Sequence, residues 1–274
     1  MNDMVVIQSV SQFLALIEEE KKREVNNGNK ADFIFRGQQK NHPLIPRIAR
    51  LIPSETTDDL VSVEKQMMDE FERQIPLFGE VTASSEWDLL ALAQHHRLPT
   101  RLLDWTYNAL VALWFCVQSG PARKANRDMV DGVVWLFKTA SKDFVNTQQN
   151  SPFKQKRTQI FRPRIVTRRI MSQAGVFTCH PLPKDNDFIS LNRNKNYKSR
   201  LKQIQVAAPF FSDIREQLGA VGVSSLTLFS DLEGLAKFIE DRYFNDPNEL
   251  SRPAWRPSGQ IKLINPSEIV PPSN

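Results

Sequence analysis

The segment at residues 86–107, EWDLLALAQHHRLPTRLLDWTY, constrains this chain more than any other, because it places charged and polar groups among leucines. A polar side chain buried among apolar ones must find a hydrogen-bond partner or serve a function. Ser85 with Asp88 three residues later is typical of a capping box, and Pro99 must end the apolar helix that follows. We therefore expect a core helix, a break at the proline and a further helix.

The second apolar run, at residues 109–117, predicts that further helix. Asp104 stands just before it and is expected to cap it, with Arg101 near enough in sequence to form an ion pair with Asp104. His95 and His96 point in different directions on the first helix, so at most one of them faces any single pocket. Because imidazole titrates near neutral pH, His95 is the candidate general acid or base, although a helical histidine bonded to a carbonyl is common.

Residues 32–38 alternate as a strand does, with phenylalanines on one face and Arg36 on the other. Arg36 would present a planar guanidinium to a phosphate or carboxylate, and the following Gly37 would let a ligand approach the backbone. Gln38 adds a second polar group on the face of Arg36. The competing interpretation is a buried Arg36 paired with a carboxylate such as Asp104.

These motifs resemble the FRG-domain family, whose members carry a similar aromatic-Arg-Gly-Gln motif and a similar run ending in Pro-Thr-Arg-Leu-Leu-Asp-Trp-Thr. The resemblance covers roughly residues 30–240 and includes, in the family's order, residues 35–38 (FRGQ), 44–50 (LIPRIAR), 173–177 (QAGVF) and 227–237 (TLFSDLEGLAK). After Gln-His the family usually has a large aromatic residue and then glycine, whereas this chain has His96 and Arg97. An extra cation is therefore expected beside the site.

The resemblance implies a bacterial or phage protein of the cytoplasm, with a role in toxin or antiviral defense systems. The strand-borne aromatic-Arg-Gly motif also looks like the first motif of ADP-ribosyltransferases, where the arginine holds the dinucleotide phosphate. That likeness implies NAD as a substrate, with Gln38, His95 and Gln173 around the nicotinamide ribose. Those enzymes generally use a late glutamate to orient the ribose and activate the nucleophile, and none is assignable in this sequence.

Two sets of site residues follow from these arguments. The expected catalytic residues are His95, Arg36, Gln38, Arg101 and Asp104. The expected ligand-binding residues are Arg36, Gln38, Arg50, Trp105 and Gln173. For Trp105 a place in the core competes with stacking on a ligand, and for Arg101 with Asp104 a structural ion pair competes with catalysis.

Three interpretations of this polar signature stay open. The first is a nucleotide- or nucleic-acid-modifying enzyme, either a transferase or a metal-independent nuclease with His95 as base and Arg36 and Arg101 as phosphate clamps. The second is a non-catalytic sensor that holds a phosphorylated ligand or RNA. The third is a buried hydrogen-bond network that specifies the fold.

Charge is distributed unevenly along the 274 residues. Residues 151–207 carry 13 Lys or Arg and two acidic residues, whereas the rest of the chain carries 23 basic and 29 acidic residues. Such a segment suits contact with the phosphates of a nucleotide or nucleic acid. The alternative is a solvated insertion between two strands.

The expected fold class is α+β, a single mixed domain with a helical N-terminal half and a strand-rich later half, for which an ADP-ribosyltransferase-like fold is one candidate. An N-terminal helix and its exit occupy residues 1–30, the FRG-like domain residues 31–244, and a proline-rich tail residues 245–274. Strands are expected at residues 132–138, 164–169, 176–180, 201–207 and 261–264, and helices at 10–17, 61–75, 211–218 and 231–243.

Several function classes lack support. The chain has no P-loop, no Rossmann glycine motif, no HExxH and no GxSxG. Cys116 and Cys179 form no CxxC, and the four histidines show no metal-ligand spacing, so we expect metal-free chemistry in a reducing cytoplasm. We also expect neither export nor a membrane span, because no basic leader precedes an apolar region and no apolar run approaches about 18 residues.

Overall fold

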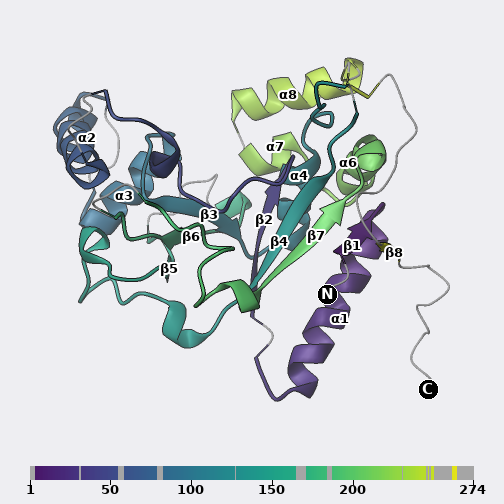
Figure 1. Ribbon diagram of the computed structural model, residues 1–274. Helices are drawn as coiled ribbons and strands as arrows, with labels where there is room; N and C mark the ends of the chain where they lie inside the picture. Colours follow the sequence, from purple (N-terminus) through teal and green to yellow (C-terminus); the bar gives the residue numbers. More distant parts are fainter. Residues whose placement is uncertain are drawn as a thin grey trace.

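A mixed sheet of eight strands, in the order β5-β6-β3-β2-β4-β7-β1-β8, runs through the molecule (Figure 1). The computed structural model describes residues 4–30, 32–54, 59–78, 83–126, 128–164, 171–183, 187–229, 231–244, 246, 248–249 and 261–263. The strands are β1 (Met4–Ile7), β2 (Phe33–Gln38), β3 (Leu102–Thr106), β4 (Gly132–Lys138), β5 (Gln159–Phe161), β6 (Gly175–Cys179), β7 (Leu201–Val206) and β8 (Ile261–Leu263). β1 is parallel to β7 and β8, and every other pairing in the sheet is antiparallel.

Side-chain caps fix the starts of five helices among the described residues. The helices are α1 (Val10–Asn26), α2 (Leu60–Gln74), α3 (Glu86–His95), α4 (Ala109–Val117), α6 (Phe211–Ala220), α7 (Ser225–Phe229) and α8 (Leu232–Tyr243). Before α3, Ser85 Oγ accepts from the backbone N–H of Asp88 at 3.2 Å, which confirms the predicted cap. α8 is capped by Asp231, whose carboxylate accepts from the N–H of Gly234.

The two faces of the sheet are covered differently. α1, α4 and α6 pack on one face around a core that includes Phe13, Phe35 and Phe211. Loops cover the other face, where Leu44 and Leu191 lie among the inward side chains of the central strands. α2 and α3 form a third apolar cluster with the end of the sheet made by β3, β5 and β6 (Figure 1). The fold is therefore α+β, as predicted.

The helix break after Pro99 contains a strand that the sequence did not predict. Residues 102–106 form β3, which pairs with β6 from Leu102–Cys179 to Thr106–Gly175. α4 starts after this strand and is capped by Asn108, whose Oδ1 accepts from the N–H of Leu110 at 3.0 Å. The expected cap at Asp104 is wrong, because that residue lies within β3.

The basic segment at residues 151–207 is not an insertion between two strands, because it supplies β5, β6 and β7 to the sheet. Two of its cations bind internal carboxylates: Arg200 bonds Asp143, and Lys202 bonds Glu20 at 2.5 Å. The strand expected at residues 164–169 lies almost wholly outside the described residues.

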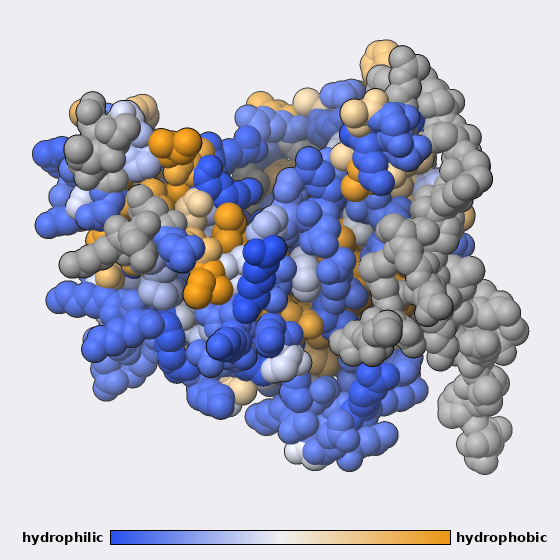
Figure 2. All heavy atoms as spheres, in the orientation of Figure 1, coloured by the Kyte–Doolittle hydropathy of each residue, from blue (hydrophilic) through white to orange (hydrophobic). Residues whose placement is uncertain are grey.

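Figure 2 shows a mainly hydrophilic face. Apolar spheres gather on the side that carries α3 and also lie on the side that carries α8, where Leu232, Leu235 and Ile239 are exposed. In the part of the chain that the structure describes, no helix is both long enough and apolar enough to span a bilayer.

Candidate functional site

The sheet opens between β2 and β3. β2 pairs with β4 over all six of its residues but with β3 through a single pair, Phe35 with Thr106. Beyond that pair, Arg36 Nη1 donates to the main-chain oxygen of Asp104 at 2.8 Å, so a side chain satisfies an acceptor that the diverging strands leave unpaired. A cavity of about 550 Å³ lies at this divergence, and we call it the β2/β3 cavity.

The β2/β3 cavity brings together most of the residues that the sequence singled out. Its lining includes Arg36, Gln38, Arg50, His95, Asp104, Trp105 and Gln173, which come from β2, α3, β3 and two loops. Arg97, the extra cation expected beside the site, also lines it. Arg101 is not among the lining residues, so the structure separates it from the other candidates.

Asp104 supplies the carboxylate of the cavity. Its side chain is 58% exposed and accepts from Gln94 Nε2 at 3.0 and 3.1 Å, while Arg36 Nη1 lies 3.7 Å from Oδ2. Gln94 is itself fixed, because its Oε1 accepts from Thr100 Oγ1 at 2.6 Å. The carboxylate is therefore held in place and still open to solvent.

Arg36 carries a charge that Asp104 balances only in part. Burial lowers the pKa of the Arg36 guanidinium, the Asp104 carboxylate opposes this shift, and the charge of Arg50 adds to it. An arginine nevertheless stays protonated in proteins. Its buried Nε has no hydrogen-bond partner among the described residues. The arrangement of a charged, partly satisfied guanidinium at a cavity wall is suited to binding an anion.

Arg101 has a structural environment. Its Nε donates to Glu64 Oε2 at 2.7 Å, its backbone N–H donates to Glu64 Oε1 at 2.9 Å, and its Nη1 donates to the carbonyl of Pro152 at 3.1 Å. The Arg101 and Glu64 side chains are 2% and 0% exposed. The expected ion pair between Arg101 and Asp104 is therefore wrong. A carboxylate from α2, 37 positions earlier, takes its place.

The other predicted residues have partners as well as positions at the cavity. Gln38 Oε1 accepts from Trp135 Nε1 at 3.0 Å. Gln173 Nε2 donates to the carbonyl of Leu228 at 3.2 Å. Trp105 is 3% exposed and its Nε1 donates to Thr178 Oγ1, which favours the core interpretation for this side chain.

Gly37 serves helix packing. A Cβ at this position would meet the carbonyl oxygen of Ala112 at 1.8 Å and the backbone nitrogen of Cys116 at 2.8 Å. α4 therefore lies directly against β2 at Gly37, and no other residue fits without moving the helix. The glycine is explained by this contact and not by the approach of a ligand.

The residues that sequence reasoning missed lie in the segment between β2 and α2. His42 and Arg47 line the cavity together with Arg50 and Arg97. Burial lowers the pKa of His42, and the charges of Lys40, Arg50 and Arg36 lower it further. The signal was present in the sequence, since residues 44–50 (LIPRIAR) carry two arginines next to a buried leucine.

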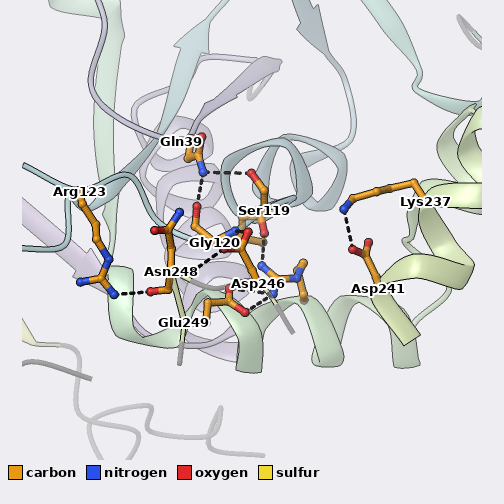
Figure 3. A network of polar contacts seen from close by, with 11 residues as sticks. Gln39, Ser119, Gly120, Arg123, Lys237, Asp241, Asp246, Asn248 and Glu249 are labelled. Atoms are coloured by element: carbon orange, nitrogen blue, oxygen red, sulfur yellow. Dashed lines mark hydrogen bonds and ion pairs between the residues drawn. The ribbon is translucent and has the colours of Figure 1, made fainter. Parts of the chain in front are cut away.

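One edge of the cavity is tied to the segment after α8 (Figure 3). Gln39, which lines the cavity, donates to Ser119 Oγ at 3.0 Å and to the carbonyl of Gly120. The N–H of Gly120 donates to Asp246 Oδ2 at 2.7 Å, and Arg123 Nη2 donates to the carbonyl of Asn248 at 2.6 Å. The segment at residues 246–249 therefore holds the loop after α4 in place against the end of β2.

A scan against protein-family models finds the FRG domain at residues 31–125. The chain contains an FRG domain. The matched range runs from β2 past α4, so it holds Arg36, His95, Arg97 and Asp104, whereas Gln173 lies outside it. No curated protein and no solved structure matches the chain. Among the described residues, no three His, Cys, Asp or Glu side chains come together as metal ligands would.

Proposed function

We propose that the FRG domain of this chain binds the phosphate of a nucleotide or nucleic acid in the β2/β3 cavity and modifies that nucleotide or nucleic acid. The protein would act as a cytoplasmic effector of a bacterium or phage. The observation that carries this proposal is charge: Arg36, Arg47, Arg50 and Arg97 line one cavity in which Asp104 is the one carboxylate among the described residues. Clustered guanidinium groups favour phosphate as the ligand, because each can donate two parallel hydrogen bonds.

Cavity size and composition support a nucleotide. Small-molecule sites commonly enclose about 300–1,000 Å³ and combine apolar walls with a few polar groups. The β2/β3 cavity has about 550 Å³, and Phe115 and Leu98 lie in its wall beside the cations. A phosphate at Arg36 would leave the apolar wall for a base or a nicotinamide ring.

The first form of the reaction is ADP-ribosyl transfer from NAD. The bond between the nicotinamide nitrogen and the ribose carbon breaks, nicotinamide leaves, and an acceptor oxygen or nitrogen bonds to that carbon and loses a proton. In the part of the chain that the structure describes, no glutamate lines the cavity. Asp104 or His95 would therefore accept the proton, with Gln38 and Gln173 beside the ribose.

The second form is cleavage of RNA without a metal, with His95 as base and Arg36 on the phosphate. His95 ends α3, and its ring lies 5.0 Å from that of His96. The sensor alternative needs the same arginines but no proton acceptor. The buried Glu64–Arg101 pair favours a structural role for Arg101 alone, so we do not assign it a phosphate contact.

The test is to incubate the purified protein with labelled NAD and, separately, with RNA, reading nicotinamide release by mass spectrometry and cleavage on gels. Arg36→Ala is expected to abolish product and to weaken nucleotide binding about 10- to 100-fold, because a charge-assisted hydrogen bond contributes about 1.5–3 kcal/mol. His95→Ala is expected to abolish product with binding retained. Lys22→Ala, which removes an exposed charge on α1, is the matched charge control.

Circular dichroism and thermal unfolding establish that each variant is folded. Binding without product in the wild-type protein would support the sensor. Unchanged binding in folded Arg36→Ala would contradict both forms of the proposal.

A further inference from the structure

Two strained residues border the β2/β3 cavity. Arg97 has φ 64° and Ala174 has φ 46°, and they are the non-glycine residues with positive φ in the part of the chain that the structure describes. Arg97 lines the cavity, and Ala174 lies between Gln173 and Gly175, which also line it. Backbone strain of this kind persists where the surrounding structure holds it, and it clusters at functional sites.

Arg97 occupies the position after a helix end where glycine is favoured. The N–H of Leu98 donates to the carbonyl of Ala93 at 2.9 Å, and the N–H of Arg97 donates to the carbonyl of Gln94 at 3.0 Å. This is the hydrogen-bond pattern that ends a helix with one left-handed residue, usually glycine because it has no Cβ. An arginine in this conformation costs free energy, and glycine could form the same backbone hydrogen bonds. The presence of an arginine therefore needs an explanation that involves its side chain.

Arg97 is one of three arginines, with Arg47 and Arg50, that line the cavity in addition to Arg36. Arg47 Nη1 donates to the carbonyl of Arg97, which holds the loop at residues 44–50 against the strained turn. Arg50 ends the short 3-10 helix Ile48–Arg50, whose Ile48 is 2% exposed and so anchors the turn in the core. The N–H of Ile48 donates to the carbonyl of Thr100 at 3.5 Å, from the same connection. The three guanidinium groups are thus carried by two loops that are fastened to each other.

These three charges lack a carboxylate. Among the described residues, no Asp or Glu side chain lies within 4.0 Å of the Arg47, Arg50 or Arg97 guanidinium. Asp104, the acid in the cavity lining, is already engaged by Arg36 and Gln94. Burial lowers the pKa of His42, and the charges of Lys40, Arg50 and Arg36 lower it further, so positive charge lies on this side of the cavity at Arg50. Like charges brought together without counter-charge are destabilising, and a bound anion would relieve them.

We infer that Arg47, Arg50 and Arg97, with His42 beside them, form a second anion subsite in the β2/β3 cavity, separate from Arg36. We call it the arginine subsite. The inference rests on the proposed function and narrows its ligand: one phosphate binds at Arg36 and another at the arginine subsite. The ligand class is therefore a nucleotide with at least two linked phosphates, such as a nucleoside diphosphate or a pyrophosphate-bridged dinucleotide.

The test is equilibrium binding of AMP, ADP, inorganic pyrophosphate and NAD to the full chain at one fixed salt concentration. Wild-type protein is expected to bind ADP at least about tenfold more tightly than AMP, because the second phosphate adds charge-assisted hydrogen bonds. Arg97→Gly and Arg50→Gln should each lower the ratio of ADP to AMP affinity to within about twofold of one. Pyrophosphate and NAD distinguish a preference for the phosphates alone from one for the dinucleotide.

Arg97→Gly has a second readout that a purely structural role would not give. Glycine accepts the left-handed conformation without a steric penalty, so the variant is expected to unfold at the same temperature as wild type or higher while binding ADP more weakly. Arg97→Lys keeps the charge without the planar fork and should restore part of the ADP preference. Lys22→Ala controls for net charge and should match wild type throughout.

The outcomes separate the two proposals. Equal affinity of the wild type for AMP and ADP, or an unchanged ADP preference in Arg97→Gly and Arg50→Gln, overturns the arginine subsite and leaves Arg36 and the proposed function standing. Conversely, loss of the ADP preference in Arg97→Gly while Arg36→Ala binds every ligand normally supports the arginine subsite and overturns the assignment of Arg36.

Discussion

Arg97 and Arg101 stand four residues apart in the sequence and occupy opposite kinds of environment. Arg101 is sealed in the interior, where Glu64 binds it through both carboxylate oxygens. Arg97 stands at a cavity wall on a strained backbone, with no ion-pair partner among the described residues. The comparison teaches that a fully partnered charge serves the fold, whereas an unpartnered one is available to a ligand. Substitutions should therefore separate stability from binding.

The largest expected effect is on stability and concerns the buried pair of Glu64 and Arg101. Glu64→Gln leaves Arg101 buried with an uncompensated charge, and removing one partner of such a pair costs about 3–5 kcal/mol of unfolding free energy. Urea denaturation measures the loss, and nucleotide affinity of the folded fraction should not change. Replacing both partners by methionine should recover much of the stability, since buried pairs are often replaceable by apolar residues. A loss below about 1 kcal/mol for Glu64→Gln would show that the pair is not sealed.

A smaller effect is the pH dependence of stability that His180 contributes. His180 is buried between Thr158 and Thr178, and burial, with the charges of Arg101 and Arg36, lowers its pKa to about 3. At a pH above about 6.5, the pKa of histidine in the unfolded chain, the ring is neutral in both the folded and the unfolded states. Its protonation therefore does not lower the free energy of unfolding there. Below about pH 6.5 the unfolded chain binds a proton that the folded chain refuses, so stability falls by about 1.4 kcal/mol per unit until about pH 3.

Urea unfolding at pH 6.5 and 4.5 measures this contribution, expected at about 2.3 kcal/mol because the unfolded histidine is already half protonated at pH 6.5. His180→Gln, which keeps a side chain able to form hydrogen bonds but does not titrate, should show a pH dependence smaller by that amount. Equal pH dependence in the two proteins would mean that His180 is protonated in the folded state.

The smallest expected effect lies in the open cavity. Asp104→Asn removes its carboxylate but leaves an amide oxygen for Gln94 and Arg36 to bind, so the unfolding free energy should change by less than about 0.5 kcal/mol. Phosphate-bearing ligands should bind about two- to fivefold more tightly, because an exposed charge contributes up to about 1 kcal/mol. Isothermal titration checks this, with Asp69→Asn on α2 as the control. Weaker ligand binding would contradict a purely electrostatic role for Asp104.

Local rules predicted much of the fold. The continuous β-rich run at residues 132–138 predicted β4 with both ends correct, and Ser85 with Asp88 predicted the start of α3. The face of β2 that carries Arg36 and Gln38 followed from the twofold period of a strand, and it placed both residues at the cavity. Each of these features depends on neighbours in the sequence.

What could not be predicted depends on distant residues. β3 is buried on both faces except at Asp104, so its sequence lacks the alternation that identifies a strand. Arg101 and Asp104 were expected to pair because they are close in sequence, whereas an offset of three along an extended chain places two side chains on opposite faces. Glu64 and Arg47 reach their partners only through tertiary packing of α2 and the loop before it.

The position of β1 has a consequence for biosynthesis. Val5 pairs with Ile204, so the strand made first must wait for a neighbour that is translated about 200 residues later. At about 5–20 residues per second, the nascent chain spends roughly 10–40 seconds with that edge of the sheet unmatched. A chaperone that shields the first residues on the ribosome would therefore be expected to improve the yield of folded protein.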